Sequence, residues 1–185
     1  MMQKEKNSLM LKQLQENWGW YFVFGIGLVV LGMLAIAYSF TATIFSVVYF
    51  GIVLILLGLF EATQAFNLNK WSNSFLHIFL SILYIVLGSY MIYNPVVNAV
   101  TITLVLAIFF VISGIIKMIF ALLYHIVHRV WLFINGALTT TLGVMIWYQW
   151  PVSGLWVLGL LVGIEILFTG WTWIMLGLLA KNINK

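Results

Sequence analysis

Residues 51–65 read GIVLILLGLFEATQA, an apolar run in which a small residue stands at every seventh position: Gly51, Gly58 and Ala65. Small residues at i and i+7 lie close to one face of a helix, two turns apart, and let a neighbouring backbone approach closely. In lipid, where burying apolar surface between helices gains little, such close contact is a main source of helix association. The stretch is therefore predicted to be a transmembrane helix with small residues along one packing face.

The same spacing recurs along the chain with a period of about 56 residues. The matching small residues on later helices are Ala107, Gly114 and Ala121, then Gly163, Gly170 and Gly177. A companion set precedes each of these runs: Gly25 and Gly32, Ser81 and Gly88, Gly136 and Gly143. We therefore predict three copies of a helical hairpin, all inserted in the same orientation, which favours a pseudo-three-fold arrangement about the membrane normal.

The composition agrees with a membrane location. Hydrophobic residues make up 64% of the chain and charged residues only 6%, with a mean hydropathy of +1.14, whereas a soluble domain carries about 25% charged residues. Each expected span is near or above the roughly 20 residues that a helix needs to cross the hydrocarbon core. The spans are 20–40, 43–66, 75–93, 96–124, 130–148 and 152–180. The predicted fold class is thus an all-α, polytopic membrane protein with six transmembrane helices.

The expected organisation is one transmembrane domain, residues 20–180, with repeats at about 20–66, 75–124 and 130–180 and a short tail at 181–185. Residues 1–19 are either a frayed cytoplasmic tail or an amphipathic helix on the membrane surface. The connections YSFTAT, YNPVVN and YQWPVS are uncharged turns on one side, whereas every basic residue lies on or next to the other side. These are Lys4, Lys6, Lys12, Lys70, Lys117, Arg129, Lys181 and Lys185. The positive-inside rule then places both termini in the cytoplasm.

Several segments together resemble the HdeD family of bacterial acid-resistance membrane proteins. They are GIGLVVLGMLAI (25–36), GIVLILLGLFEATQAF (51–66), SILYIVLGSYMIYNP (81–95) and LLVGIEILFTGWTWIMLGL (160–178). Asn94-Pro95 matches the family's turn, and Gly163-Ile164-Glu165 matches its late Gly-Ile-acidic segment, although YSFT replaces a proline at the first turn and glutamate replaces the commoner aspartate. The resemblance implies a stress-response protein of the bacterial inner (plasma) membrane, and it brings no catalytic residue with it.

Glu165 is the sharpest functional candidate, because ionisable residues within membrane spans are rare and generally face protein or water. Two readings are open. In one, Glu165 senses or relays protons. In the other, its carboxyl group forms a hydrogen bond across a helix seam, for example to Thr141 or Thr169, and such a bond contributes about 1 kcal/mol in bilayers. A proton pathway normally needs several relay groups, and only one carboxyl lies this deep, so the structural reading is favoured.

Glu61 and Lys117 occupy equivalent repeat positions, each three residues after its glycine, Gly58 or Gly114, and the third repeat has Trp173 there. Either the two charged residues form an ion pair that lines a cytoplasmic vestibule, or each side chain snorkels separately to the interface.

The remaining polar residues are predicted mainly to form a polar loop at the headgroups, although His125 and His128 could instead sense acidification. His125, His128 and Arg129 form a small cluster, but a zinc site needs three or four ligands, and the chain has no cysteine. Protease, phosphate-binding and nucleophile-elbow motifs are absent from the sequence. We therefore expect no catalytic, cofactor or metal site. The basic residues stand singly between apolar runs, so no nucleic-acid partner is expected.

The expected partners are the lipid bilayer and either other membrane proteins or further copies of the chain. The predicted function is a structural or interaction role in the membrane under acid stress. The alternative is a small channel or transporter for protons or a solute that uses Glu165.

Overall fold

The computed structural model describes residues 18–67, 71–123 and 129–182, and within these ranges the chain is helical apart from short connections. Six helices are long and apolar enough to cross a membrane, which confirms the predicted fold class. The elements are α2 (Trp18–Ala37), α3 (Ser39–Asn67), α4 (Trp71–Tyr93), α5 (Pro95–Leu123), α6 (Arg129–Tyr148), the 3-10 helix η1 (Val152–Leu155) and α7 (Val157–Asn182).

The first and third connections are much shorter than the predicted turns. Tyr38 alone separates α2 from α3, and Asn94 alone separates α4 from α5. At the α4–α5 connection the Asn98 backbone N–H donates to the Asn94 carbonyl at 3.1 Å. The Asn98 side-chain amide also donates to the Asn94 carbonyl at 2.8 Å and to the Tyr90 carbonyl at 3.2 Å. These bonds satisfy carbonyls at the end of α4 that the helix itself leaves without partners.

The last span begins later than the predicted residue 152, because the chain first forms η1. Gly154 of this turn lies directly against α5, since a Cβ there would stand 2.6 Å from the Val100 Cα. The Trp150 indole N–H donates to the Val100 carbonyl at 3.2 Å, and the Ser153 hydroxyl donates to the Ile146 carbonyl at 2.8 Å. These contacts hold the α6–α7 connection as a packed turn and move the start of α7 to Val157.

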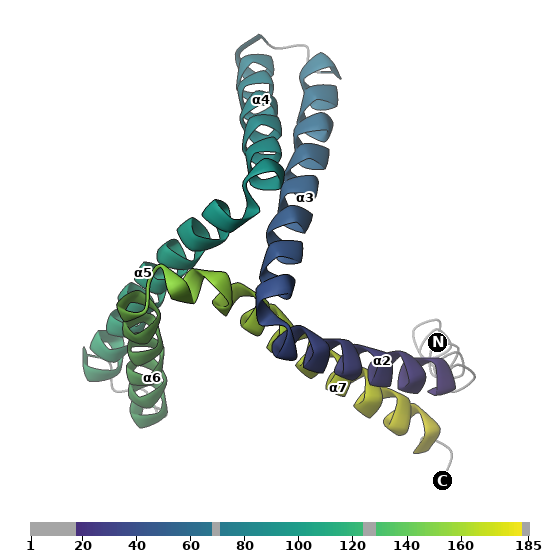
Figure 1. Ribbon diagram of the computed structural model, residues 1–185, viewed down its shortest axis with the longest axis vertical. Coiled ribbons are helices and arrows are strands. Elements are labelled where there is room, and N and C mark those ends of the chain that lie inside the picture. Colours follow the sequence, from purple (N-terminus) through teal and green to yellow (C-terminus); the bar gives the residue numbers. More distant parts are fainter. Residues whose placement is uncertain (1–17, 68–70, 124–128, 183–185) are drawn as a thin grey trace, which may run out of the picture. The chain divides into compact units, whose positions relative to one another are not determined.

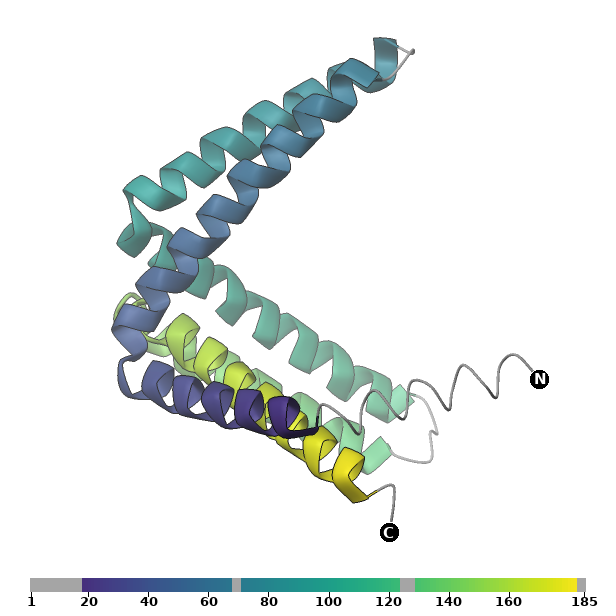
Figure 2. The ribbon, with the colours of Figure 1, turned by 90° about the vertical axis from the view of Figure 1, so that its right-hand side faces the viewer.

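The described helices fall into two compact units. One unit contains α2 and all but the first two residues of α7, and the other runs from Thr43 to Leu158, so that it holds almost all of α3 together with α4, α5, α6 and η1. In the first unit α2 and α7 lie side by side, and in the second α3 lies beside α4 and α5 beside α6 (Figures 1 and 2). A small core cluster of Val47, Ala99 and Leu158 is buried within the second unit.

These packed pairs do not coincide with the sequence repeats. In each pair one helix comes from one repeat and its neighbour from another: α3 and α4 belong to the first and second repeats, α5 and α6 to the second and third, and α2 and α7 to the first and third. The repeating unit of sequence and the packed unit of structure are therefore different pairs of helices.

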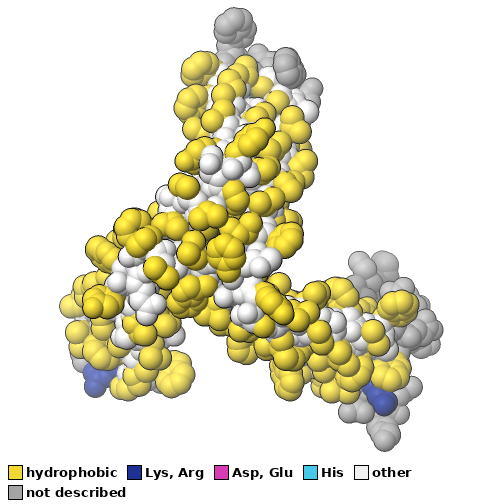
Figure 3. Space-filling view, in the orientation of Figure 1, with side chains coloured by type: hydrophobic (Ala, Val, Ile, Leu, Met, Phe, Trp, Pro, Cys, Tyr) yellow, Lys and Arg dark blue, Asp and Glu magenta, His cyan; other side chains and the backbone are white. Residues whose placement is uncertain are grey.

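The outward surfaces of the helices are apolar. Large side chains such as Phe45 and Leu122 are 71% and 72% exposed, and in the view of Figure 3 hydrophobic side chains cover most of the described surface, with Lys and Arg only near the ends of helix pairs. A surface of this composition suits lipid as its solvent. The buried positions are instead mostly small residues that lie between paired helices.

Candidate functional site

Each helix pair contains a seam in which glycines face each other across the contact. A Cβ added to Gly25 of α2 would lie 2.8 Å from the Gly170 carbonyl oxygen of α7, and one added to Gly170 would lie 2.8 Å from that of Gly25. Gly51 and Gly88 stand in the same reciprocal relation between α3 and α4, at 2.8 and 2.5 Å. Because backbone atoms occupy the space, these positions admit no side chain without separating the helices.

The same contact continues along each seam. Gly114 and Gly136 oppose each other between α5 and α6, with added Cβ atoms 2.6 and 2.8 Å from the opposite carbonyl oxygens. Neighbouring seam glycines meet backbone or branched side chains in the same way. They are Gly32 against Gly163, Gly58 against Ile85, Gly143 against Ala107, and Gly177 against Phe22. Ser81 replaces glycine at one seam position, and its buried hydroxyl donates to the Gly58 carbonyl at 2.8 Å.

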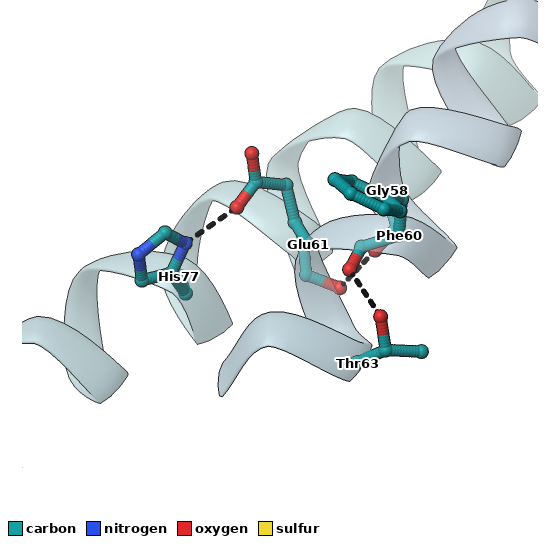
Figure 4. A network of polar contacts seen from close by, with 6 residues as sticks. Gly58, Phe60, Glu61, Thr63 and His77 are labelled. Carbon is teal, nitrogen blue, oxygen red and sulfur yellow. Dashed lines mark hydrogen bonds and ion pairs between the residues drawn. The ribbon is translucent and has the colours of Figure 1, made fainter. Parts of the chain in front are cut away.

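The carboxyl group of Glu61 contacts the His77 ring across the α3–α4 seam. His77 Nδ1 lies 2.5 Å from Glu61 Oε2, and the side chains are 33% and 25% exposed (Figure 4). His77 stands four residues before Ser81, so it lies on the face of α4 that packs against α3. Nearby, the Thr63 hydroxyl donates to the Phe60 carbonyl at 2.7 Å, a bond within α3. The carboxylate of Glu61 is therefore held by its own helix pair.

Lys117, at the equivalent position of the next repeat, is held in the same manner. Its Nζ donates to Asn135 Oδ1 of α6 at 3.0 Å. No salt bridge between Glu61 and Lys117 is present in the part of the chain that the structure describes, and an ion pair between them stays one of the two predicted alternatives. Each charged side chain finds a polar partner across its own seam, one helix away.

The third equivalent position, Trp173 of α7, has aromatic partners. Its ring stacks on Tyr21 of α2, with centroids 5.6 Å apart and an interplanar angle of 19°, and meets Phe24 edge-on at 5.7 Å. The same repeat position therefore makes a different contact in each seam. The carboxyl group of Glu61 meets an imidazole, the ammonium group of Lys117 meets an amide, and the indole of Trp173 meets a phenol ring. This position distinguishes the three seams from one another.

Glu165 lies on the face of α7 that points away from α2. It follows the seam residue Gly163 by two positions, a rotation of about 200° around the helix at 3.6 residues per turn. The side chain is exposed, and among the described residues it has no hydrogen bond or ion pair. The Thr141 hydroxyl donates to the Ala137 carbonyl of its own helix at 2.9 Å. A hydrogen bond from Glu165 to Thr141 or Thr169 remains a prediction.

The remaining polar candidates that the structure describes, Arg129 and Lys181, lie near helix ends. His125 and His128, like the tail 1–17, lie outside the described residues, whereas Arg129 begins α6. Lys181 near the end of α7 places its Nζ 4.7 Å from the centroid of the Trp18 ring, a cation–π contact. Within residues 18–67, 71–123 and 129–182, no three His, Cys, Asp or Glu side chains converge in a group that could hold a metal ion.

Sequence reasoning missed the partners of Glu61 and Lys117, although a signal for both was present. His77 lies one turn before Ser81, and Asn135 directly precedes Gly136, so both belong next to the small residues that define a seam.

The structure also buries the hydroxyl of Thr103 on α5 with no hydrogen-bond partner among the described residues.

Comparison with protein-family models matches this chain to a family described as a short repeat of unknown function, DUF308, over residues 23–93 and again over residues 79–148. The matches begin 56 residues apart, which equals the spacing of the seam glycines, and together they span more than half of the chain. No curated protein and no solved structure gives a significant match. On the evidence of its repeats, the chain belongs to the DUF308 family.

Proposed function

We propose that this chain is an HdeD-type protein of the bacterial inner membrane, with both termini in the cytoplasm. Its role is structural or interactive, and it supports the membrane or other membrane proteins under acid stress. The family match and the resemblance of four segments to HdeD proteins support this proposal. The distribution of Lys and Arg supports the orientation. No described residue is assigned a catalytic role.

The observation that carries the interaction role is the position of Glu165. The residue lies eight positions after the start of α7, or about 12 Å along a helix that rises 1.5 Å per residue. A carboxyl group at that depth is costly in lipid unless it faces protein or water. Since Glu165 points away from its packed neighbour α2, it provides a polar contact for another transmembrane helix.

Two substitutions at Glu165 separate this role from proton conduction. Glutamine keeps the size and hydrogen-bonding capacity of the side chain but cannot release a proton, whereas leucine removes both properties. We expect Glu165→Gln to keep most of the wild-type survival of acid-challenged cells and Glu165→Leu to lose it. Survival is measured in a deletion strain that carries each variant, with Ile164→Leu as the neighbouring exposed control and membrane levels of each protein compared by immunoblot.

Equal loss of survival in the two variants would contradict the interaction role. If cells with Glu165→Gln survive acid as poorly as cells with Glu165→Leu at equal protein level, the carboxyl group must titrate in order to act. Proton flux into proteoliposomes with an acidic exterior then provides the direct comparison of wild type, Glu165→Gln and empty vesicles. Flux that wild type shows and Glu165→Gln lacks would make the protein a proton conductor.

A further inference from the structure

An open groove lies where the α5–α6 pair ends. Its volume is about 380 Å³, and the lining residues that the structure describes come from the last turn of α5 and the first turns of α6: Ala121, Leu122, Arg129, Val130 and Phe133. Ala121 stands seven residues after Gly114 and continues the small-residue face of α5. Ala121 as a whole residue is only 5% exposed, so a small seam residue borders the groove.

Among the described residues, the lining of the groove is apolar except for one cation. Leu122, Val130 and Phe133 are 72%, 66% and 40% exposed, which leaves hydrocarbon surface open beside the guanidinium of Arg129. In the described structure no carboxylate forms a salt bridge with Arg129, and the two acidic residues of that structure lie elsewhere, Glu61 with His77 and Glu165 on α7. The groove therefore pairs an uncompensated positive charge with a hydrophobic wall.

The other described cations have partners of their own. Lys117 donates to Asn135, and Lys181 lies over the Trp18 ring. Arg129 differs because its described neighbours in the groove can contact a hydrocarbon chain but cannot neutralise charge. A guanidinium binds phosphate oxygens through two parallel hydrogen bonds, and basic pockets between transmembrane helices on the cytoplasmic side bind acidic lipid headgroups.

We propose that this groove binds an acidic phospholipid, with the headgroup phosphate on Arg129 and the start of an acyl chain along Leu122, Val130 and Phe133. Free phosphate would use the guanidinium alone and would leave the exposed apolar wall without a role. The proposal goes beyond the function proposed above and does not depend on Glu165, because the described lining of the groove belongs to the α5–α6 pair.

The test is retention of phosphatidylglycerol and of phosphatidylcholine by the full-length detergent-solubilised protein, measured by native mass spectrometry. We expect wild type to retain phosphatidylglycerol preferentially and Arg129→Gln to lower its apparent affinity about fivefold, since one basic residue near the surface is worth about 1 kcal/mol toward acidic lipid. Lys181→Gln, at the end of another helix pair, is expected to leave the affinity unchanged. Inorganic phosphate is expected not to displace the lipid.

A second variant tests the apolar wall and leaves the charge in place. Leu122→Trp changes a largely exposed side chain and fills the groove, so it is expected to reduce retention of phosphatidylglycerol while thermal unfolding stays near wild type. Equal retention of the two lipids by wild type would overturn the proposal. So would an equal effect of Lys181→Gln and Arg129→Gln, or displacement of the lipid by inorganic phosphate.

Discussion

Replacing Gly32 with leucine is expected to lower the free energy of unfolding by about 3 kcal/mol, the upper end of the range for overpacked cores. A Cβ at this position would stand 2.7 Å from the Leu167 backbone nitrogen and 2.9 Å from the Gly163 carbonyl oxygen. Both atoms belong to the backbone of α7, so no side-chain rotation relieves the clash and the helices must separate. Denaturant unfolding in mixed micelles measures the loss.

Gly27 of the same helix supplies the matched control. A Cβ at Gly27 would meet nothing within 4 Å, and the residue lies on the exposed face of α2. Gly27→Leu is therefore expected to be neutral or to stabilise the protein by up to about 1 kcal/mol through helix propensity. Equal destabilisation by Gly27→Leu and Gly32→Leu would show that glycine is needed for some reason other than the contact with α7.

Removing one member of the Glu61–His77 pair is expected to cost about 1–3 kcal/mol, because the partner is left without its hydrogen bond in a partly buried position. Removing both members with Glu61→Leu and His77→Leu together is expected to recover most of that loss, since an apolar pair of similar shape is often neutral. The Trp173–Tyr21 contact at the equivalent position of another seam already shows an uncharged pair there.

A double-mutant cycle measures this coupling in the unfolding free energy of wild type, the two single variants and the double variant. Additive effects of the two single substitutions would contradict an energetic link between the side chains. The Lys117–Asn135 contact of the α5–α6 seam provides a comparison. Lys117→Leu is expected to lower the free energy of unfolding, and adding Asn135→Leu is expected to recover part of that loss.

The six spans could be predicted because the thickness of the bilayer fixes how long an apolar helix must be. The repeat was also readable, since small residues at i and i+7 are a direct requirement of close helix contact. The partner of each helix could not be derived in this way. Every helix of every repeat has similar small residues, so the seam of α2 fits that of a neighbour in the same repeat or in another repeat equally well.

The polar positions were only partly predictable for a related reason. The equivalence of Glu61 and Lys117 followed from their repeat positions, but their partners His77 and Asn135 depend on which helices pair. The direction of Glu165 was available from the phase of the helix relative to Gly163 and Gly170, because seam residues fix which side of α7 faces α2. The late start of α7 depends on contacts of Trp150 and Gly154 with α5 that no local pattern announces.

The most direct test is a crosslink between the first and last helices at a place where side chains already meet. The chain has no cysteine, so a pair introduced as Tyr21→Cys and Trp173→Cys is the only one present. The two native rings stack across the contact of α2 with α7 with their centroids 5.6 Å apart, so cysteines there lie within reach of a short bismaleimide and leave every seam glycine in place. The matched control moves the second cysteine to Thr172, which is exposed on α7.

We predict that a short bismaleimide in native membranes links Tyr21→Cys to Trp173→Cys within one chain, and that the Thr172→Cys control stays largely unlinked. The link is detected by electrophoresis after protease cleavage between α2 and α7. A Tyr21–Trp173 pair that links no more than the Thr172 control would contradict the pairing of α2 with α7, and with it the conclusion that each seam joins two different repeats.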